Sequence, residues 1–230
     1  MKKLKNIKIN LDVSSMKRDL LFDLDDTIVN TNNSRKVVIE KILQNYSHRH
    51  FTVDEVSSLL KENVQNDCYD TTQYILKKYN VEVDVKDIIK DFAKIYTEIA
   101  ETQEHLMISL DVIKKLQEKY NLYIITGRPR ELYDIYWNDK LSKYFKAAVC
   151  FGDFPDIPRK PAPEVILKTI EKYKLNAEYY IGNSTKDIMA ANNAGLKAIF
   201  ITSTNKDIEE IKKYNPYKIL ADINDILTIL

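Results

Sequence analysis

Two aspartates separated by one residue are the feature of the sequence that most clearly suggests chemistry. Asp23 and Asp25 lie in the run Asp23-Leu24-Asp25-Asp26-Thr27, directly after Leu20-Leu21-Phe22. Alternate residues of an extended segment project to the same side, so the two carboxylates can converge on one small volume. Close carboxylates repel unless a cation or a shared proton relieves them, and Mg²⁺ prefers oxygen ligands of this kind. The spacing indicates either a magnesium site or a solvent-exposed acidic turn.

Such a pair can divide the steps of phosphoryl transfer between its members. Asp23 would act as the nucleophile and form a covalent aspartyl phosphate. Asp25 would protonate the leaving oxygen and then activate the water that hydrolyses the intermediate.

The segments around these residues alternate between strand and helix patterns. The run 19–24 is a short apolar strand that ends in acidic residues. Strands are predicted at 121–126, 147–151, 178–182 and 197–202, with helices at 109–119, 130–143, 162–174 and 185–194 and a final strand and helix from Tyr217. This alternation predicts an α/β fold with a doubly wound parallel sheet, in which ligands bind beyond the carboxyl ends of the strands.

A helical segment interrupts this alternation. Helices are predicted at 34–47, 53–64, 69–79 and 84–104, and Thr52 with Glu55 has the form of a capping box at the second of them. Residues 5–13 alternate like a half-buried strand. The predicted organisation is an N-terminal extension at 1–17, a core made of 18–32 and 107–230, and a helical insert at 33–106.

The composition excludes several classes of protein. Lys and Arg (35) nearly balance Asp and Glu (34) in 230 residues, so no net field would attract nucleic acid or an anionic membrane surface. No apolar stretch is long enough for a signal peptide or a membrane span. Cys68 and Cys150 are far apart and suggest neither a disulfide nor a zinc site. We expect a cytoplasmic protein, whose oligomeric state the sequence leaves open.

Three glycines directly follow predicted strands. At Gly127, Gly152 and Gly182 the missing Cβ would let backbone amides approach an anion, although each could also be an ordinary turn. Gly195 precedes a strand and is more plausibly a helix stop.

Four motifs occur together in a fixed order. The apolar strand leading into Asp-x-Asp-x-Thr is followed by Ile124-Ile125-Thr126-Gly127, Arg159-Lys160-Pro161-Ala162-Pro163-Glu164 and Gly182-Asn183-Ser184-Thr185-Lys186-Asp187. This set resembles the haloacid dehalogenase-like hydrolases. It is most similar to the phosphoglycolate phosphatase and β-phosphoglucomutase type, which carries a helical cap between the first two motifs.

The resemblance implies roles for the second and third motifs. Thr126, with Gly127, would bind a phosphoryl oxygen of the substrate, and Lys160 would neutralise the nucleophile and the transferring group. Thr126 could instead be the N-cap of the helix that follows, with Pro129 in its first turn. Arg128 and Arg130 would either touch the substrate or only decorate the start of that helix.

The fourth motif departs from the family pattern. The family generally has Gly-Asp-x-x-x-Asp, whereas Asn183 stands here in place of the first acid. The resemblance implies Mg²⁺ held by Asp23, the backbone carbonyl of Asp25, Asn183 and Asp187. An amide removes one negative charge, so weaker metal binding is expected.

These features together predict a magnesium-dependent phosphatase for a small phosphorylated metabolite. The cap would be a lid with hinges at 30–33 and 106–109. Asp25 counts against a dehalogenase, which lacks an acid at that position. The alternative suggested by Asn183 is a non-catalytic phosphate-binding or regulatory protein.

Overall fold

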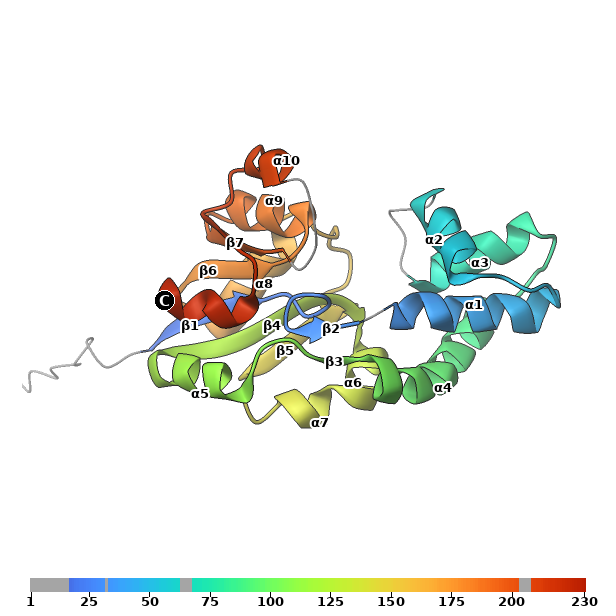
Figure 1. Cartoon of the computed structure of the whole chain (residues 1–230), viewed down its shortest axis with the longest axis horizontal. Helices are drawn as coiled ribbons and strands as arrows, with labels where there is room; N and C mark the ends of the chain where they lie inside the picture. The colour runs from blue at the N-terminus through green and yellow to red at the C-terminus, as the bar shows by residue number, and fades with distance from the viewer. Residues whose placement is uncertain (1–16, 32, 63–67, 203–207) are drawn as a thin grey trace, which may run out of the picture.

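A six-stranded parallel sheet forms the centre of the larger part of the chain (Figure 1). The computed structural model describes residues 17–31, 33–62, 68–202 and 208–230, so the strand predicted at 5–13 lies outside the described residues. The strand order is β5-β4-β1-β6-β7-β8. The strands are β1 (Arg18–Phe22), β4 (Tyr120–Pro129), β5 (Ala147–Phe151), β6 (Ala177–Gly182), β7 (Lys197–Ile201) and β8 (Lys218–Leu220).

The central strand β1 is buried on both faces. It pairs in parallel with β4 on one side and with β6 on the other. Leu20 and Phe22 pack into the apolar cluster on one face, and Leu21 packs into the cluster on the opposite face. This is the alternation that a strand with period two requires, and it explains why the run is apolar throughout. The predicted doubly wound parallel sheet is confirmed.

Helices cover both faces of the sheet. The first face is covered by α5 (Leu110–Lys119), α6 (Arg130–Tyr136), α7 (Asn138–Leu141) and the 3₁₀ helix η2 (Ile223–Thr228). The second face is covered by α8 (Glu164–Tyr173), α9 (Thr185–Asn193) and α10 (Ile208–Lys212). The predicted helix 130–143 is therefore two helices, on either side of Trp137, and α10 was not predicted.

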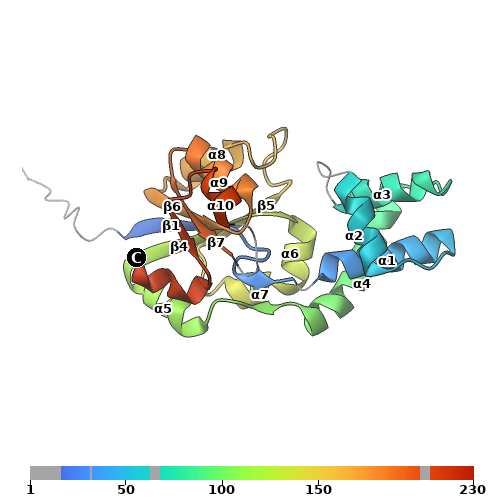
Figure 2. The ribbon, with the colours of Figure 1, turned by 45° about the horizontal axis from the view of Figure 1, so that its top comes forward.

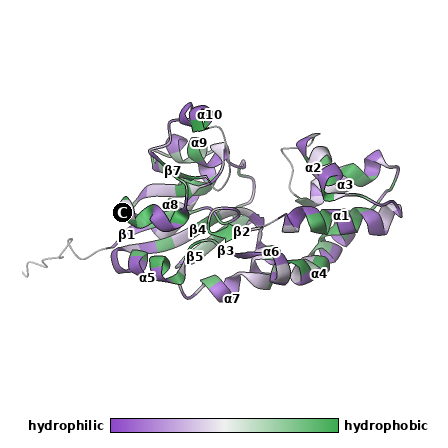
Figure 3. Cartoon of the chain, in the orientation of Figure 1, coloured by the Kyte–Doolittle hydropathy of each residue, from purple (hydrophilic) through white to green (hydrophobic). Residues whose placement is uncertain are grey.

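Four further helices stand beside the sheet (Figure 2) and surround a second apolar cluster, which Leu132 of α6 also joins. They are α1 (Ser34–Ser47), α2 (Val53–Glu62), α3 (Cys68–Lys78) and α4 (Val85–Gln103). Their starts match the sequence pattern, and the Thr52 hydroxyl accepts a bond from the Glu55 amide at 3.2 Å, as the predicted cap requires. Along α1 and α4 hydrophobic and hydrophilic residues alternate, consistent with one face turned to this cluster (Figure 3).

Two short strands join these helices to the rest of the chain. β2 (Val29–Asn30) and β3 (His105–Leu106) pair antiparallel, with Val29 opposite Leu106 and Asn30 opposite His105. The Met107 amide also donates to the Ile28 carbonyl at 2.9 Å. The segment that enters the helical insert therefore lies beside the segment that leaves it. No helix among the described residues is both long and apolar enough to cross a membrane.

Candidate active site

The predicted site residues gather at one edge of the sheet. Asp23 directly follows β1, Thr126 lies near the end of β4, and Asn183 directly follows β6. These three strands are neighbours, and the chain reverses its direction of winding at β1. Ligands bind in parallel sheets at such a switch point, beyond the carboxyl ends of the strands.

A cavity of about 1350 Å³ lies at this edge, between the sheet and the helical insert. The core contributes every site residue that the sequence predicts, namely Asp23, Asp25, Thr126, Gly127, Lys160, Asn183 and Asp187. The insert contributes residues from α1, α3 and α4, among them Arg35, Cys68, Phe92 and Tyr96. A molecule in this cavity would touch both parts of the chain.

Lys160 joins two of the buried carboxylates. Its ammonium nitrogen lies 2.7 Å from Oδ1 of Asp23 and 2.5 Å from Oδ1 of Asp187. It also donates to the Tyr180 hydroxyl at 2.9 Å. All three charged side chains are largely shielded from solvent, which strengthens the attraction between them. One ammonium group therefore bridges two carboxylates near the end of β1.

This arrangement changes the acidity of its members. Burial raises the pKa of Asp23 from 3.8 to about 7; Lys160 opposes the rise, and the carboxylates of Asp187 and Asp25 add to it. Burial alone would lower the pKa of Lys160, but attraction to Asp187 and Asp23 raises it well above its usual value. Lys160 therefore stays charged. Any further positive charge placed beside Asp23 would favour the ionised form of its carboxylate.

Asp187 is held by the turn that starts α9. Its Oδ2 accepts bonds from the Ser184 amide at 3.0 Å and the Ser184 hydroxyl at 2.5 Å, and the Asp187 amide donates back to that hydroxyl, forming a capping box. Asp187 as a whole is only 2% exposed. Both of its oxygens thus have partners, Ser184 on one and Lys160 on the other.

Thr126 lies inside β4 and does not cap the next helix. The N-cap of α6 is Pro129, so the alternative reading of Thr126 as an N-cap is wrong. Its hydroxyl accepts a bond from the Arg128 amide at 3.1 Å. A Cβ added to Gly127 would meet nothing within 4 Å, so the backbone here is open on that side.

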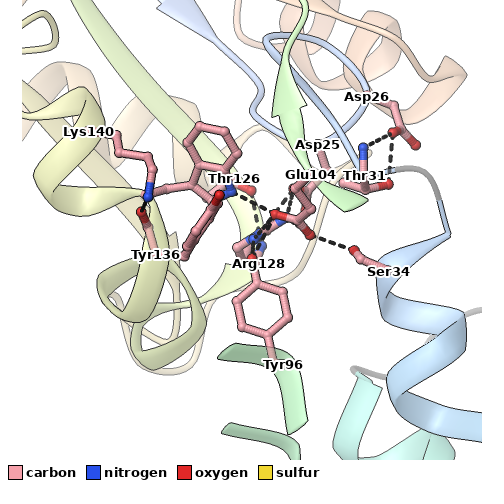
Figure 4. A network of polar contacts seen from close by, with 11 residues as sticks. Asp25, Asp26, Thr31, Ser34, Tyr96, Glu104, Thr126, Arg128, Tyr136 and Lys140 are labelled. Atoms are coloured by element: carbon pink, nitrogen blue, oxygen red, sulfur yellow. Dashed lines mark hydrogen bonds and ion pairs between the residues drawn. The ribbon is translucent and has the colours of Figure 1, made fainter. Parts of the chain in front are cut away.

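Asp25 has a partner that the sequence did not reveal. Its Oδ1 accepts bonds from Nε and Nη2 of Arg128 at 3.0 and 2.5 Å (Figure 4). The same guanidinium donates to Glu104 at 3.0 and 3.1 Å and contacts the Tyr96 hydroxyl. Arg128 is therefore not an exposed group at a helix start, since only 6% of its side chain is accessible. Arg130 instead pairs with Asp153 and Asp134.

Sequence reasoning missed Glu104, which gathers these contacts. It is the residue after α4 and is fully buried, and it accepts bonds from the Ser34 hydroxyl at 2.5 Å, the Tyr96 hydroxyl at 2.8 Å and the Trp137 indole at 2.6 Å. The available signal was an acid at a helix C-terminus, where the helix dipole disfavours negative charge. An acid in that place needs a cationic partner, and Arg128 provides it.

The donors near Asp23 are the kind that Mg²⁺ accepts. Among the described residues, no three His, Cys, Asp or Glu side chains are grouped to hold a metal by themselves. The available set combines the Asp23 carboxylate with the Asp25 backbone and the Asn183 amide, which line the same cavity. These are oxygen donors with few charges, and they suit an ion that also binds phosphate and water.

Comparison with known sequences agrees with the four motifs. The family described as haloacid dehalogenase-like hydrolase matches residues 20–201. The pyrophosphatase PpaX of Bacillus mycoides is 25% identical over 218 residues, covering 92% of this chain and 95% of that protein.

Solved structures share the fold. CbbY of Rhodobacter sphaeroides in complex with phosphate has a TM-score of 0.73 and 14% identity, covering 92% of this chain and 96% of that one. YfnB of Bacillus subtilis bound to magnesium has a TM-score of 0.72 and 22% identity, covering 93% and 98%. The ordered motifs, the sheet and the family match agree: the chain belongs to the haloacid dehalogenase-like hydrolases.

Proposed function

We propose that the protein is a magnesium-dependent phosphatase that acts on a small phosphorylated metabolite. The observation that carries the proposal is the contact of Lys160 with both Asp23 and Asp187, at 2.7 and 2.5 Å, on the wall of a cavity shared by core and helical insert. A buried lysine beside a carboxylate at a sheet switch point suits the charge of a phosphoryl group in transfer.

The reaction has two steps. An oxygen of Asp23 attacks the phosphorus, the bond from phosphorus to the leaving oxygen breaks, and Asp25 gives that oxygen a proton. Asp25, now a carboxylate, then takes a proton from water as the water oxygen attacks the aspartyl phosphate. The bond from phosphorus to Asp23 breaks, which restores both carboxyl groups and yields inorganic phosphate.

Lys160, Thr126 and Gly127 bind the phosphoryl group in this proposal. Lys160 offsets the charge of Asp23 and of the equatorial oxygens, so that two negative groups can approach. The Thr126 hydroxyl donates to a phosphoryl oxygen while it accepts from the Arg128 amide, because a hydroxyl can do both. The open side of Gly127 leaves its backbone accessible to the same group.

Magnesium would be held by the Asp23 carboxylate, the Asp25 carbonyl and the Asn183 amide. When bound, it supplies positive charge that favours the ionised form of Asp23 and offsets the charge of the phosphate. We assign Asp187 to positioning Lys160 rather than to metal binding, because Ser184 and Lys160 already occupy its oxygens.

The helical insert acts as a cap. We propose a core of residues 18–32 and 107–230, a cap of residues 33–106 and a separate N-terminal extension of residues 1–17. The paired strands β2 and β3 are the connection about which the cap would move. Interdomain movement is described for the magnesium-bound YfnB, which shares this fold. Closure would exclude water from the cavity and complete the substrate contacts.

The relatives support the proposed substrate class. CbbY was solved with phosphate, and the cavity of about 1350 Å³ has more room than a small metabolite needs. PpaX proteins are named as pyrophosphatases, so pyrophosphate belongs in any substrate panel.

Turnover of p-nitrophenyl phosphate by purified protein, with and without Mg²⁺, tests the proposal. We expect release of nitrophenol that requires the metal and is lost in Asp23→Asn. The second candidate, a non-catalytic phosphate-binding protein, is motivated by Asn183. Phosphate binding without turnover, across metals and pH, would support that candidate and contradict ours.

A further inference from the structure

A buried ionic network of Glu104 and Arg128 connects the cap to Asp25. Arg128 lies two residues after Thr126 on β4, and its guanidinium lies between two carboxylates. One edge contacts Asp25 through Nε and Nη2, at 3.0 and 2.5 Å. Its Nη1 and Nη2 contact Glu104 at 3.0 and 3.1 Å. The planar guanidinium fixes the angle between these two edges, so the two contacts are not independent.

The Glu104 end of this ionic network is the rigid one. Glu104 is fully buried and accepts bonds from Ser34, Tyr96 and Trp137 as well as from Arg128. Ser34 begins α1 and Glu104 follows α4, so the two ends of the helical insert meet at this carboxylate, as Figure 4 shows. Trp137 lies in the core, between α6 and α7. Glu104 is therefore held from the cap and from the core together.

The Asp25 end is the adjustable one. Its side chain is 38% exposed toward the cavity, whereas those of Arg128 and Glu104 are 6% and 0% exposed. Among the described residues, Arg128 donates the side-chain hydrogen bonds that the Asp25 carboxylate accepts. The position of that carboxylate thus depends on Arg128, and the position of Arg128 depends on Glu104.

We propose that Arg128, anchored by Glu104 of the cap, positions the Asp25 carboxyl group for proton exchange with the leaving oxygen. The proposal rests on the function proposed above. A general acid must lie within hydrogen-bond reach of the oxygen that it protonates, and a small displacement costs much of the rate. Arg128 is a positioning residue in this account, since it acts through Asp25 and not on the phosphoryl group.

Comparison of two leaving groups separates this role from a merely structural one. Phenyl phosphate and p-nitrophenyl phosphate present similar rings, but phenolate is the more basic leaving group and needs protonation more. A displaced Asp25 therefore lowers kcat/KM, which reports transfer of the phosphoryl group to Asp23, selectively for phenyl phosphate. Hydrolysis of the aspartyl phosphate, in which Asp25 is the base, is common to the two substrates and affects kcat for both. A general loss of folded protein, or a lost phosphate contact, slows both substrates alike.

The variant is Arg128→Lys, which keeps the positive charge and loses the planar fork. The matched control is Arg130→Lys, because Arg130 lies two residues away and pairs with Asp153 and Asp134 instead. We expect Arg128→Lys to lower kcat/KM for phenyl phosphate by about 10- to 100-fold and kcat/KM for p-nitrophenyl phosphate by less than about 3-fold. The control should keep the wild-type ratio of the two kcat/KM values.

Glu104→Gln is the second variant, in case Arg128→Lys does not fold. It keeps the shape of the side chain and weakens its hold on Arg128, so the same selective loss should appear in smaller measure. Equal losses of kcat/KM on the two substrates, or a higher kcat/KM for phenyl phosphate, would overturn the proposal. A wild-type protein that hydrolyses neither substrate with Mg²⁺ would contradict the proposed function itself, and the inference would fall with it.

Discussion

Gly182 lies directly against Asp187: a Cβ built at position 182 would be 2.5 Å from the Asp187 Cβ and 2.6 Å from its Cγ. The close approach lets the end of β6 pack onto the first turn of α9. It also fixes the carboxylate that holds Lys160. Glycine is thus needed at position 182 because a larger residue would not fit. The sequence, which indicated only a turn or an anion-binding backbone, did not reveal this.

Gly182→Ala should therefore lower both stability and activity. Overpacking of this kind typically costs about 1–3 kcal/mol of unfolding free energy. The matched control is Gly127→Ala, whose added Cβ meets nothing within 4 Å and should leave stability within about 0.5 kcal/mol of wild type. Urea unfolding of the two variants measures the difference. Equal stability of the two variants would show that the Asp187 side chain can move away from the added methyl group without loss of stability.

Asp23 should make the metal-free protein less stable as the pH rises. Its pKa is about 7 in the folded chain against an ordinary value of 3.8, so the folded state binds the proton more tightly. The stability that comes from this proton is complete below about pH 4 and is lost as the pH rises through 7. The Asp23→Asn variant should not lose stability in this way, because its amide does not titrate.

Thermal unfolding in the presence of a chelator tests whether ionisation of Asp23 lowers the stability. The melting temperature of Asp23→Asn minus that of wild type should become more positive between pH 5 and pH 8, by an amount equivalent to a few kcal/mol. A difference that stays constant across this range would contradict the raised pKa. A difference that becomes more negative would show that Lys160 stabilises the ionised form more than burial disfavours it.

Asn183→Asp should tighten magnesium binding. The substitution restores the acid that the family generally carries and adds one negative charge beside Asp23. Calorimetric titration with Mg²⁺ and the metal dependence of turnover measure the effect, which we expect as about a 10-fold lower apparent Kd. Unchanged or weaker metal dependence would mean that position 183 does not face the ion.

Leu132 of α6 should matter for stability because it belongs to the apolar cluster that helices α1 to α4 surround. Its side chain is buried, so Leu132→Ala should cost about 2–5 kcal/mol. Leu167 on α8 is the control, because it is exposed and its truncation removes little buried surface. Urea unfolding should separate the two variants. A loss at Leu132 as small as that at Leu167 would show that Leu132 contributes little to the packing of α6 against this cluster.

The fold class and most elements could be predicted because their signals are local. Runs such as Leu20-Leu21-Phe22 are apolar on both faces, and the cap helices carry helical periodicity. The pairs β2 and β3, with two residues each, and α10, with five, are too short to produce a periodic signal. The family and its hydrolase character, predicted from four ordered motifs, are confirmed.

The site could be predicted only where a motif marks it. Lys160 and Asp23 belong to motifs, and the structure brings them into contact. Glu104 and Arg128 belong to no shared pattern, and they meet only because the cap ends close to β4. Contacts of this kind depend on packing between parts distant in the sequence, which local patterns do not encode.

Identification of the residue that carries phosphate during turnover tests the role of Asp23 as the nucleophile. The protein would be mixed with p-nitrophenyl phosphate and Mg²⁺, quenched during turnover, and reduced with borohydride, which converts an aspartyl phosphate to homoserine. Peptide mass spectrometry should then find homoserine at position 23, and none in the sample without substrate or in Asp23→Asn. Continued turnover without homoserine at position 23, or with homoserine at another aspartate, would show that Asp23 is not the nucleophile.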